Sequence, residues 1–198
     1  MFKSEDELQS KYGIKEKGDW LNLKEGSNKV RIVSHFVDYG IHSIKGERKY
    51  KSVICIGKEN NCPYCAKGIK VKVQFLGWVI DRADGKIKLL KIGWTIKEKL
   101  RKLQHSEDYG FTNLPDYDID IIRTGEGLDT NYDVLPARKS TELTEEEKEK
   151  ILEVVKDPQE IIDKMKEKVL SAAEDLREEL PPLKEDNPEE VDLEDIPF

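Results

Sequence analysis

The stretch HSIKGERKYKSVICIGKENNCPYC, residues 42–65, decides the fold of this chain because it holds all three cysteines and a histidine. Its ligating side chains are spaced as His42-x12-Cys55-x6-Cys62-x2-Cys65. Imidazole and thiolate are the ligands that Zn²⁺ prefers, and a structural zinc site takes four of them in a tetrahedron. A C-x-x-C turn supplies two adjacent ligands, and a second pair from elsewhere completes the site. The stretch therefore predicts one structural Zn²⁺ ion held by these four residues.

A redox role is the alternative for the same cysteines, because Cys62-Pro63-Tyr64-Cys65 is the tetrapeptide of glutaredoxins. The first residues, MFKSEDE, are charged rather than apolar and do not form a secretory signal. A reducing, cytoplasmic compartment is therefore expected, where clustered cysteines indicate metal or redox chemistry. Redox chemistry needs a low-pKa thiol that begins a helix after a strand, whereas residues 57–61 form a polar turn. Zinc is the favoured interpretation, and a thiol oxidoreductase stays as an alternative.

Charge is distributed unevenly along the 198 residues, although the net charge is −7. Residues 1–139 contain 26 Lys and Arg against 20 Asp and Glu, whereas residues 140–198 contain 8 against 21. The most basic segment, residues 20–102, contains 19 against 7. A basic body followed by an acidic segment suggests a polyanion-binding domain and an interaction tail. No stretch approaches the roughly 18–20 apolar residues of a membrane helix, so no membrane contact is expected.

Short segments of alternating apolar and polar residues predict a mainly β fold. The predicted strands are residues 20–23, 29–37, 50–56, 70–80, 86–93, 117–123 and 132–135. Asp84-Gly85 has the turn chemistry of a hairpin, and residues 94–104 have helical spacing. Strands of this number and length, interrupted by one helix, fit a small β-barrel. Trp20 is expected to lie in its core.

Two helices are predicted after the β region. Thr144-Glu145-Glu146-Glu147 is a capping box that opens a helix ending at about residue 155. Asp157 and Pro158 are typical of the N-cap and first position of a second helix, which has an apolar stripe over residues 161–180. That stripe predicts a packing face against the barrel or against a second copy of the chain.

The last residues are polar. Residues 183–198 hold seven acidic residues and one lysine, with little to bury, and are predicted to be disordered. The predicted organisation is an N-terminal extension at 1–18, a β domain at 19–140 with a zinc subdomain at about 38–70, C-terminal helices at 141–182 and an acidic tail at 183–198.

Basic and aromatic residues are interleaved in the predicted strands, which favours single-stranded nucleic acid as a ligand. Such ligands are held by a cationic groove and by rings on which the bases stack. Alternation along residues 70–80 places Lys72 and Trp78 on one face. The opposite face, which includes Val71 and Val73, is expected to be core. The predicted contacts, which are expected to line one cleft, are Lys45, Arg48, Lys49, Tyr50, Lys51, Lys70, Lys72, Trp78, Lys88 and Trp94.

The chain resembles the zinc-containing single-stranded-DNA-binding proteins of T-even and related phages. Their zinc pattern places a histidine twelve residues before the first cysteine and ends in C-P-x-C. His42, Cys55, Cys62 and Cys65, with Pro63 between the last two, match this pattern. The resemblance covers roughly residues 19–156. It implies an OB-fold barrel with a zinc subdomain and sequence-independent binding of single-stranded DNA, without catalysis, in replication, recombination and repair in the host cytoplasm. Residues 1–10 are acidic, unlike the basic N-terminal arm of that family.

The C-terminal segment DLEDIPF, residues 192–198, resembles the acidic tip of bacterial single-stranded-DNA-binding proteins, which ends in Asp-Ile-Pro-Phe. In that family the tip docks replication and repair enzymes. A terminal carboxylate and a Phe ring suit an apolar pocket rimmed by Arg or Lys. The residues expected to dock are Asp192, Glu194, Asp195, Ile196, Pro197 and Phe198. A zinc-ribbon adaptor that binds only protein is a further alternative, and no catalytic set stands out beyond the cysteines.

Overall fold

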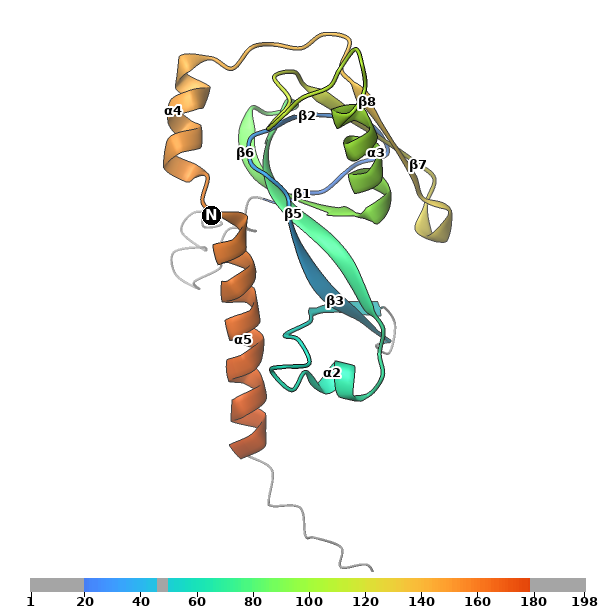
Figure 1. The fold of residues 1–198 in the computed structure, drawn as a ribbon, viewed down its shortest axis with the longest axis vertical. Coiled ribbons are helices and arrows are strands. Elements are labelled where there is room, and N and C mark those ends of the chain that lie inside the picture. Colours follow the sequence, from blue (N-terminus) through green and yellow to red (C-terminus); the bar gives the residue numbers. More distant parts are fainter. Residues whose placement is uncertain (1–19, 46–49, 179–198) are drawn as a thin grey trace, which may run out of the picture.

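The protein is mainly β, with a mixed eight-stranded sheet and a few helices (Figure 1). The computed structural model describes residues 20–45 and 50–178; the predicted extension, residues 46–49 and the acidic tail lie outside this part. The sheet has the order β1-β6-β5-β2-β7-β8, and β3 pairs with both β4 and β5. The strands are β1 (Trp20–Leu21), β2 (Gly26–Ile32), β3 (Val37–Lys45), β4 (Tyr50–Ile54), β5 (Val71–Asp81), β6 (Lys86–Gly93), β7 (Ile119–Thr124) and β8 (Asn131–Pro136).

The described helices are α2 (Pro63–Ala66), α3 (Trp94–Gln104), the short 3₁₀ helix η1 (Gly127–Asp129), α4 (Glu145–Val154) and α5 (Pro158–Glu178). Helices α3, α4 and α5 begin where the sequence predicts them, whereas the short helices α2 and η1 were not predicted. The capping box of α4 is confirmed, because the Thr144 hydroxyl accepts from the Glu147 N–H and the Glu147 carboxylate accepts from the Thr144 N–H. At the start of α5 the Asp157 carboxylate accepts from the Gln159 N–H at 2.9 Å. None of the described helices combines the length and apolarity needed to cross a bilayer.

The body of the molecule is the curved part of the sheet around a core of aliphatic side chains. Strands β2, β5, β6, β7 and β8 surround this core, which includes Val30, Val79, Leu90, Ile119 and Ile121. Helix α3 contributes Ile96 and Leu100 and contacts β5, β6 and β8. These contacts place the helix over the side where β6 and β8 would have to meet.

The predicted barrel is not confirmed, because the sheet is open in the part of the chain that the structure describes. No ladder joins β6 to β8 there. Instead β1 runs parallel to β6, with Trp20 opposite Leu89 and Leu21 opposite Leu90. Strand β1 thus occupies the edge of β6 that a closed barrel would use.

The predicted strand at 29–37 is broken after Ile32, and a longer strand follows it. Between the two strands the Ser34 hydroxyl accepts from the Trp78 N–H at 2.7 Å, and the Phe36 ring lies against Gly77. A Cβ at Gly77 would come within 2.8 Å of that ring, so glycine permits the close packing. The chain then leaves the body as β3. Together with β4, α2 and the first half of β5 it forms an extension, here called the arm (residues 37–76), with α2 near its end (Figure 1).

Helix α5 packs along β3, β4 and β5 and covers a second core at the junction of arm and body. Ile162 of α5 is fully buried there together with Ile41, Leu76 and Trp78. The Trp78 indole N–H donates to the backbone oxygen of Lys156 at 2.8 Å. The described part of the predicted apolar stripe, Ile161, Ile162, Met165 and Val169, is therefore a packing face against the sheet.

A buried ionic cluster attaches the chain before α4 to the body. Asp118 accepts from the Nε atoms of Arg31 and Arg82, at 2.8 and 3.0 Å. Arg82 also contacts Glu147 of α4 at 2.6 Å, and Arg31 donates to the Ser140 hydroxyl at 3.0 Å. The Arg31 and Asp118 side chains are only 4% and 5% exposed, so each charge depends on the other for compensation.

Candidate functional site

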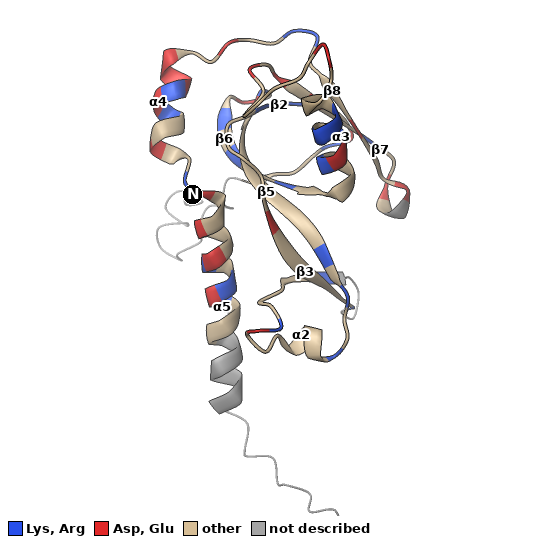
Figure 2. Ribbon diagram, in the orientation of Figure 1, with Lys and Arg blue, Asp and Glu red and all other residues tan. Residues whose placement is uncertain are grey.

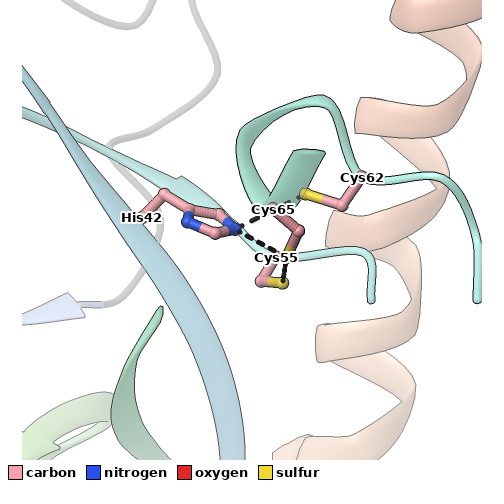
Figure 3. A group of neighbouring side chains, drawn as sticks. All are labelled: His42, Cys55, Cys62 and Cys65. Atoms are coloured by element: carbon pink, nitrogen blue, oxygen red, sulfur yellow. Dashed lines mark hydrogen bonds between the residues drawn. The ribbon is translucent and has the colours of Figure 1, made fainter. Parts of the chain in front are cut away.

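The four predicted ligands meet in the arm (Figure 3). His42 lies on β3, Cys55 follows β4 directly, Cys62 is the N-cap residue of α2, and Cys65 lies within α2. A tight turn brings the cysteines together, in which the Cys62 N–H donates to the oxygen of Gly57 at 3.1 Å. Gly57 has φ +90°, a left-handed conformation that favours glycine.

The geometry of these side chains fits one tetrahedral metal ion. The Nε2 atom of His42 lies 3.4 Å from the sulfur of Cys62 and 3.5 Å from that of Cys65, and the sulfurs of Cys55 and Cys65 are 3.5 Å apart. All four ligand atoms fall within 4.8 Å of one another. Bonds of about 2.0–2.3 Å to a central ion would separate tetrahedral ligands by about 3.3–3.8 Å. The cluster can therefore hold one metal ion.

The thiol environments indicate what such an ion would contribute. Burial and the neighbouring sulfurs of Cys55 and Cys62 raise the pKa of Cys65 to about 11. Burial also raises the pKa of Cys62, but hydrogen bonds from backbone N–H groups, led by that of Cys65, bring it down to about 7. Three thiolates repel one another in this space, and a dication between them would remove the repulsion.

The glutaredoxin-like alternative is less compatible with the structure. Cys62 does begin a helix, and its pKa is lowered to about 7, as a redox thiol requires. However, this residue is only 2% exposed, so a substrate disulfide cannot reach its sulfur. The helix has four residues, and a turn rather than a strand precedes it. Metal binding accounts for all four residues, whereas redox chemistry leaves His42 and Cys55 without a role.

Four of the ten predicted DNA contacts are exposed lysines on the arm, and Figure 2 shows basic residues there and on β6 and α3. Lys45 ends β3, Lys51 lies on β4, and Lys72 lies on β5; all three are exposed, as is Lys70. Tyr50 begins β4. Arg48 and Lys49 lie outside the described residues.

Among the described residues, the predicted contacts do not line one cleft, because they lie on different faces of the sheet. Trp78 is 7% exposed and packs beneath α5, so it is a core residue rather than a base-stacking one. Lys88 is engaged by Asp81 and Asp84 at 2.8 and 2.6 Å. Conversely, Val71 and Val73, predicted as core, are exposed, because the arm extends beyond the core of the body.

Trp94 is a predicted contact whose ring is accessible. It is 58% exposed at the start of α3 and packs against Phe75, with the ring centres 5.9 Å apart. The ammonium of Lys97 lies 4.7 Å from the centre of the indole, a cation–π arrangement. Lys97 was not among the predicted contacts, although a position three residues after Trp94 on a helix places it on the same side.

A second surface combines aromatic and basic residues where β1 and β6 face the ends of β7 and β8. It is a cleft of about 1030 Å³, here called the Trp20 cleft, whose lining includes Trp20, Lys86, Lys88, Lys91, Arg123 and Tyr132. Trp20 is 38% exposed, so its prediction as a core residue is wrong. Arg123 and Tyr132 were not predicted because the β7–β8 ladder, which no local spacing reveals, places them opposite each other. Only the complete fold brings them and Trp20 to one cleft.

Comparison with known proteins gives one informative similarity. The chain is 33% identical over 66 residues to a protein of Escherichia phage T5 described as a probable ssDNA-binding protein. The match covers 33% of this chain and 25% of that relative, so the chain accounts for about a quarter of the relative's length. No family model matches the chain. No solved structure matches it.

Proposed function

We propose that this protein binds single-stranded DNA without sequence preference and without catalysing a reaction. The observation that carries the proposal is that two of its three tryptophans, Trp20 and Trp94, are exposed beside lysines on the basic body. Exposed rings next to cations are what an unpaired strand needs, because bases stack on the rings while phosphates meet the charges. The similarity to a probable ssDNA-binding protein of phage T5 supports the same class of ligand.

The connectivity of the body supports an OB-type fold, although the sheet is open. Strands β2, β5, β6, β7 and β8 follow one another with α3 after the third, and β2 pairs with both β5 and β7. An OB fold is a five-stranded and partly open Greek-key barrel that commonly binds oligonucleotides. In this interpretation the arm is an insertion between the first two barrel strands.

We further propose that the metal is a single structural Zn²⁺ ion. Three thiolates and one imidazole form a closed set of four ligands, which is typical of structural zinc and leaves no open position for catalysis. When bound, the ion would hold β3, the end of β4 and α2 in their present arrangement.

Titration of a fluorescent dT oligonucleotide tests the proposed function. We expect binding to single strands that is much tighter than binding to the corresponding duplex. Affinity should fall with salt, with a log–log slope of about −0.7 for each phosphate neutralised. No binding at low salt, or equal binding of duplex, would contradict the proposal.

We also propose that residues 192–198 dock replication, recombination or repair proteins, in the cytoplasm of the host if the protein is encoded by a phage. The support is the sequence itself: acidic residues lead to Ile196-Pro197-Phe198. A Phe ring and a terminal carboxylate can enter an apolar pocket rimmed by basic side chains, while the acids steer the encounter.

Deleting residues 184–198 should tighten DNA binding at low salt. This segment carries seven acidic residues and no basic residue other than Lys184, and these acids compete with phosphates for the basic body. The difference should vanish as added salt screens the charges. A chain in which the seven acids are replaced by their amides is the matched control and should behave like the deletion. Equal affinities of the full chain and the deletion at low salt would contradict this competition.

A further inference from the structure

We propose that the Trp20 cleft is a binding site for single-stranded polynucleotide, with Trp20 as the base-stacking residue and Arg123 as a phosphate contact. This inference rests on the proposed function and assigns it a place on the molecule. Lys88 is the predicted contact that lines this cleft, whereas Trp94 and the lysines of the arm lie outside it. The supporting observations are the charge balance of the cleft, one incompletely bonded arginine and the way in which Trp20 is held.

Among the described residues, the cleft is lined by more basic than acidic side chains. Lys88 is bridged to Asp81 and Asp84 and is therefore compensated. Lys86, Lys91 and Arg123 also line the cleft, and none of them forms an ion pair within residues 20–45 and 50–178. Three uncompensated cations around one hollow attract a polyanion.

Arg123 retains hydrogen-bonding capacity inside the protein. One terminal N–H group donates to the backbone oxygen of Leu23 at 3.1 Å, which fixes the guanidinium beside β1. Its Nε atom is buried and has no hydrogen-bond partner among the described residues. A buried donor without an acceptor is unfavourable. A phosphate in the cleft would bring the opposite charge to the half-buried guanidinium that lines it.

Trp20 is held firmly enough to act as a stacking platform. Its backbone pairs with Leu89 of β6, so the residue belongs to the sheet, while more than a third of its side chain stays exposed. Tyr132 lines the cleft from β8, where it pairs with Arg123 across the ladder to β7. Bases are enclosed in a duplex but are free to reach such rings in a single strand, which selects the unpaired form.

Variants of the cleft, paired with variants elsewhere, test the assignment by oligo-dT titration. Trp20→Leu should lower affinity about 5- to 160-fold, the range for loss of one stacked base. The double variant Lys86→Gln/Lys91→Gln should lower affinity and reduce the salt slope by about 1.4, which corresponds to two phosphates. The matched control is the double variant Lys164→Gln/Lys168→Gln on α5, whose lysines are exposed and outside the cleft. Melting by circular dichroism shows whether each variant is folded.

The outcomes separate this inference from the proposed function. If the unmodified protein fails to bind oligo-dT, the proposed function itself is wrong. If it binds, and both cleft variants bind as tightly as the α5 control, the inference is overturned while the function stands. If Trp20→Leu proves unstable, the double lysine variant decides by its salt slope. Photocrosslinking of bromouracil oligonucleotides should label peptides containing Trp20 or Tyr132, and labelling confined to peptides of the arm and α3 would also overturn it.

Discussion

Replacing His42 with asparagine should abolish binding of the proposed Zn²⁺ ion and disorder the arm. Structural zinc contributes about 10–16 kcal/mol of apparent binding free energy in small domains, and this site closes the segment from Cys55 to Cys65. Few apolar side chains are buried within that segment, with Ile56 and Cys62 as the exceptions. Without the ion, three sulfurs within 4.8 Å of each other have nothing to hold them together.

Metal content by mass spectrometry and amide hydrogen exchange of residues 55–70 measure this effect. The matched control is His35→Asn, because His35 is exposed and lies outside the cluster. We expect about one zinc per chain in the control and close to none in the His42 variant, with fast exchange in the segment. Chelation of the unmodified protein at elevated temperature should reproduce the result. Full protection of residues 55–70 in a metal-free protein would show that the arm does not depend on an ion.

Replacing Asp118 with alanine should destabilise the whole body by about 3–5 kcal/mol, the usual cost of removing one partner from a buried ion pair. Arg31 would keep its charge at 4% side-chain exposure without a carboxylate to compensate it. Arg82 would lose the same partner and retain Glu147 and a longer hydrogen bond to the backbone oxygen of Thr141. Domains of this size are commonly stable by only 5–15 kcal/mol, so the loss is a large part of the total.

Urea denaturation of the variant against Asp133→Ala measures the difference. Asp133 also pairs with a lysine, Lys99 at 3.0 Å, but its side chain is more than half exposed. Exposed pairs contribute about 0–1 kcal/mol, so the control should unfold close to the unmodified protein. Similar midpoints for the two variants would mean that the Arg31–Asp118 pair contributes no more than a surface pair.

The parts of the structure that depend on local chemistry could be predicted from the sequence. The spacing of His42, Cys55, Cys62 and Cys65 was sufficient to group them, because few other roles unite these side chains. Helix α4 was predicted from its capping box, and the β5–β6 hairpin from Asp84-Gly85, where Gly85 has φ +70°. In each case a few neighbouring residues determine the conformation.

The parts that depend on long-range packing could not be predicted in this way. Alternation correctly placed Trp78 and Val73 on opposite faces of β5, but it does not show which face another element covers. Helix α5, which begins 80 residues after Trp78 along the chain, covers the face with the tryptophan and leaves Val73 exposed. The prediction that Trp20 lies in the core was wrong for a related reason. The two residues of β1 pair with the edge of β6, so the sheet stays open and the indole ring stays accessible.

Strand β5 makes the connection between the arm and the body rigid. Its 11 residues are unbroken and span about 36 Å, of which the first part belongs to the arm and the last to the body. Between Gln74 and Leu76 the strand is paired with β3 on one side and β6 on the other. A hinge motion at this point would have to break the hydrogen bonds of both ladders. The arm and the body therefore move as one rigid unit and do not close on a ligand. A ligand that contacts both the arm and the body would therefore bind a preformed surface.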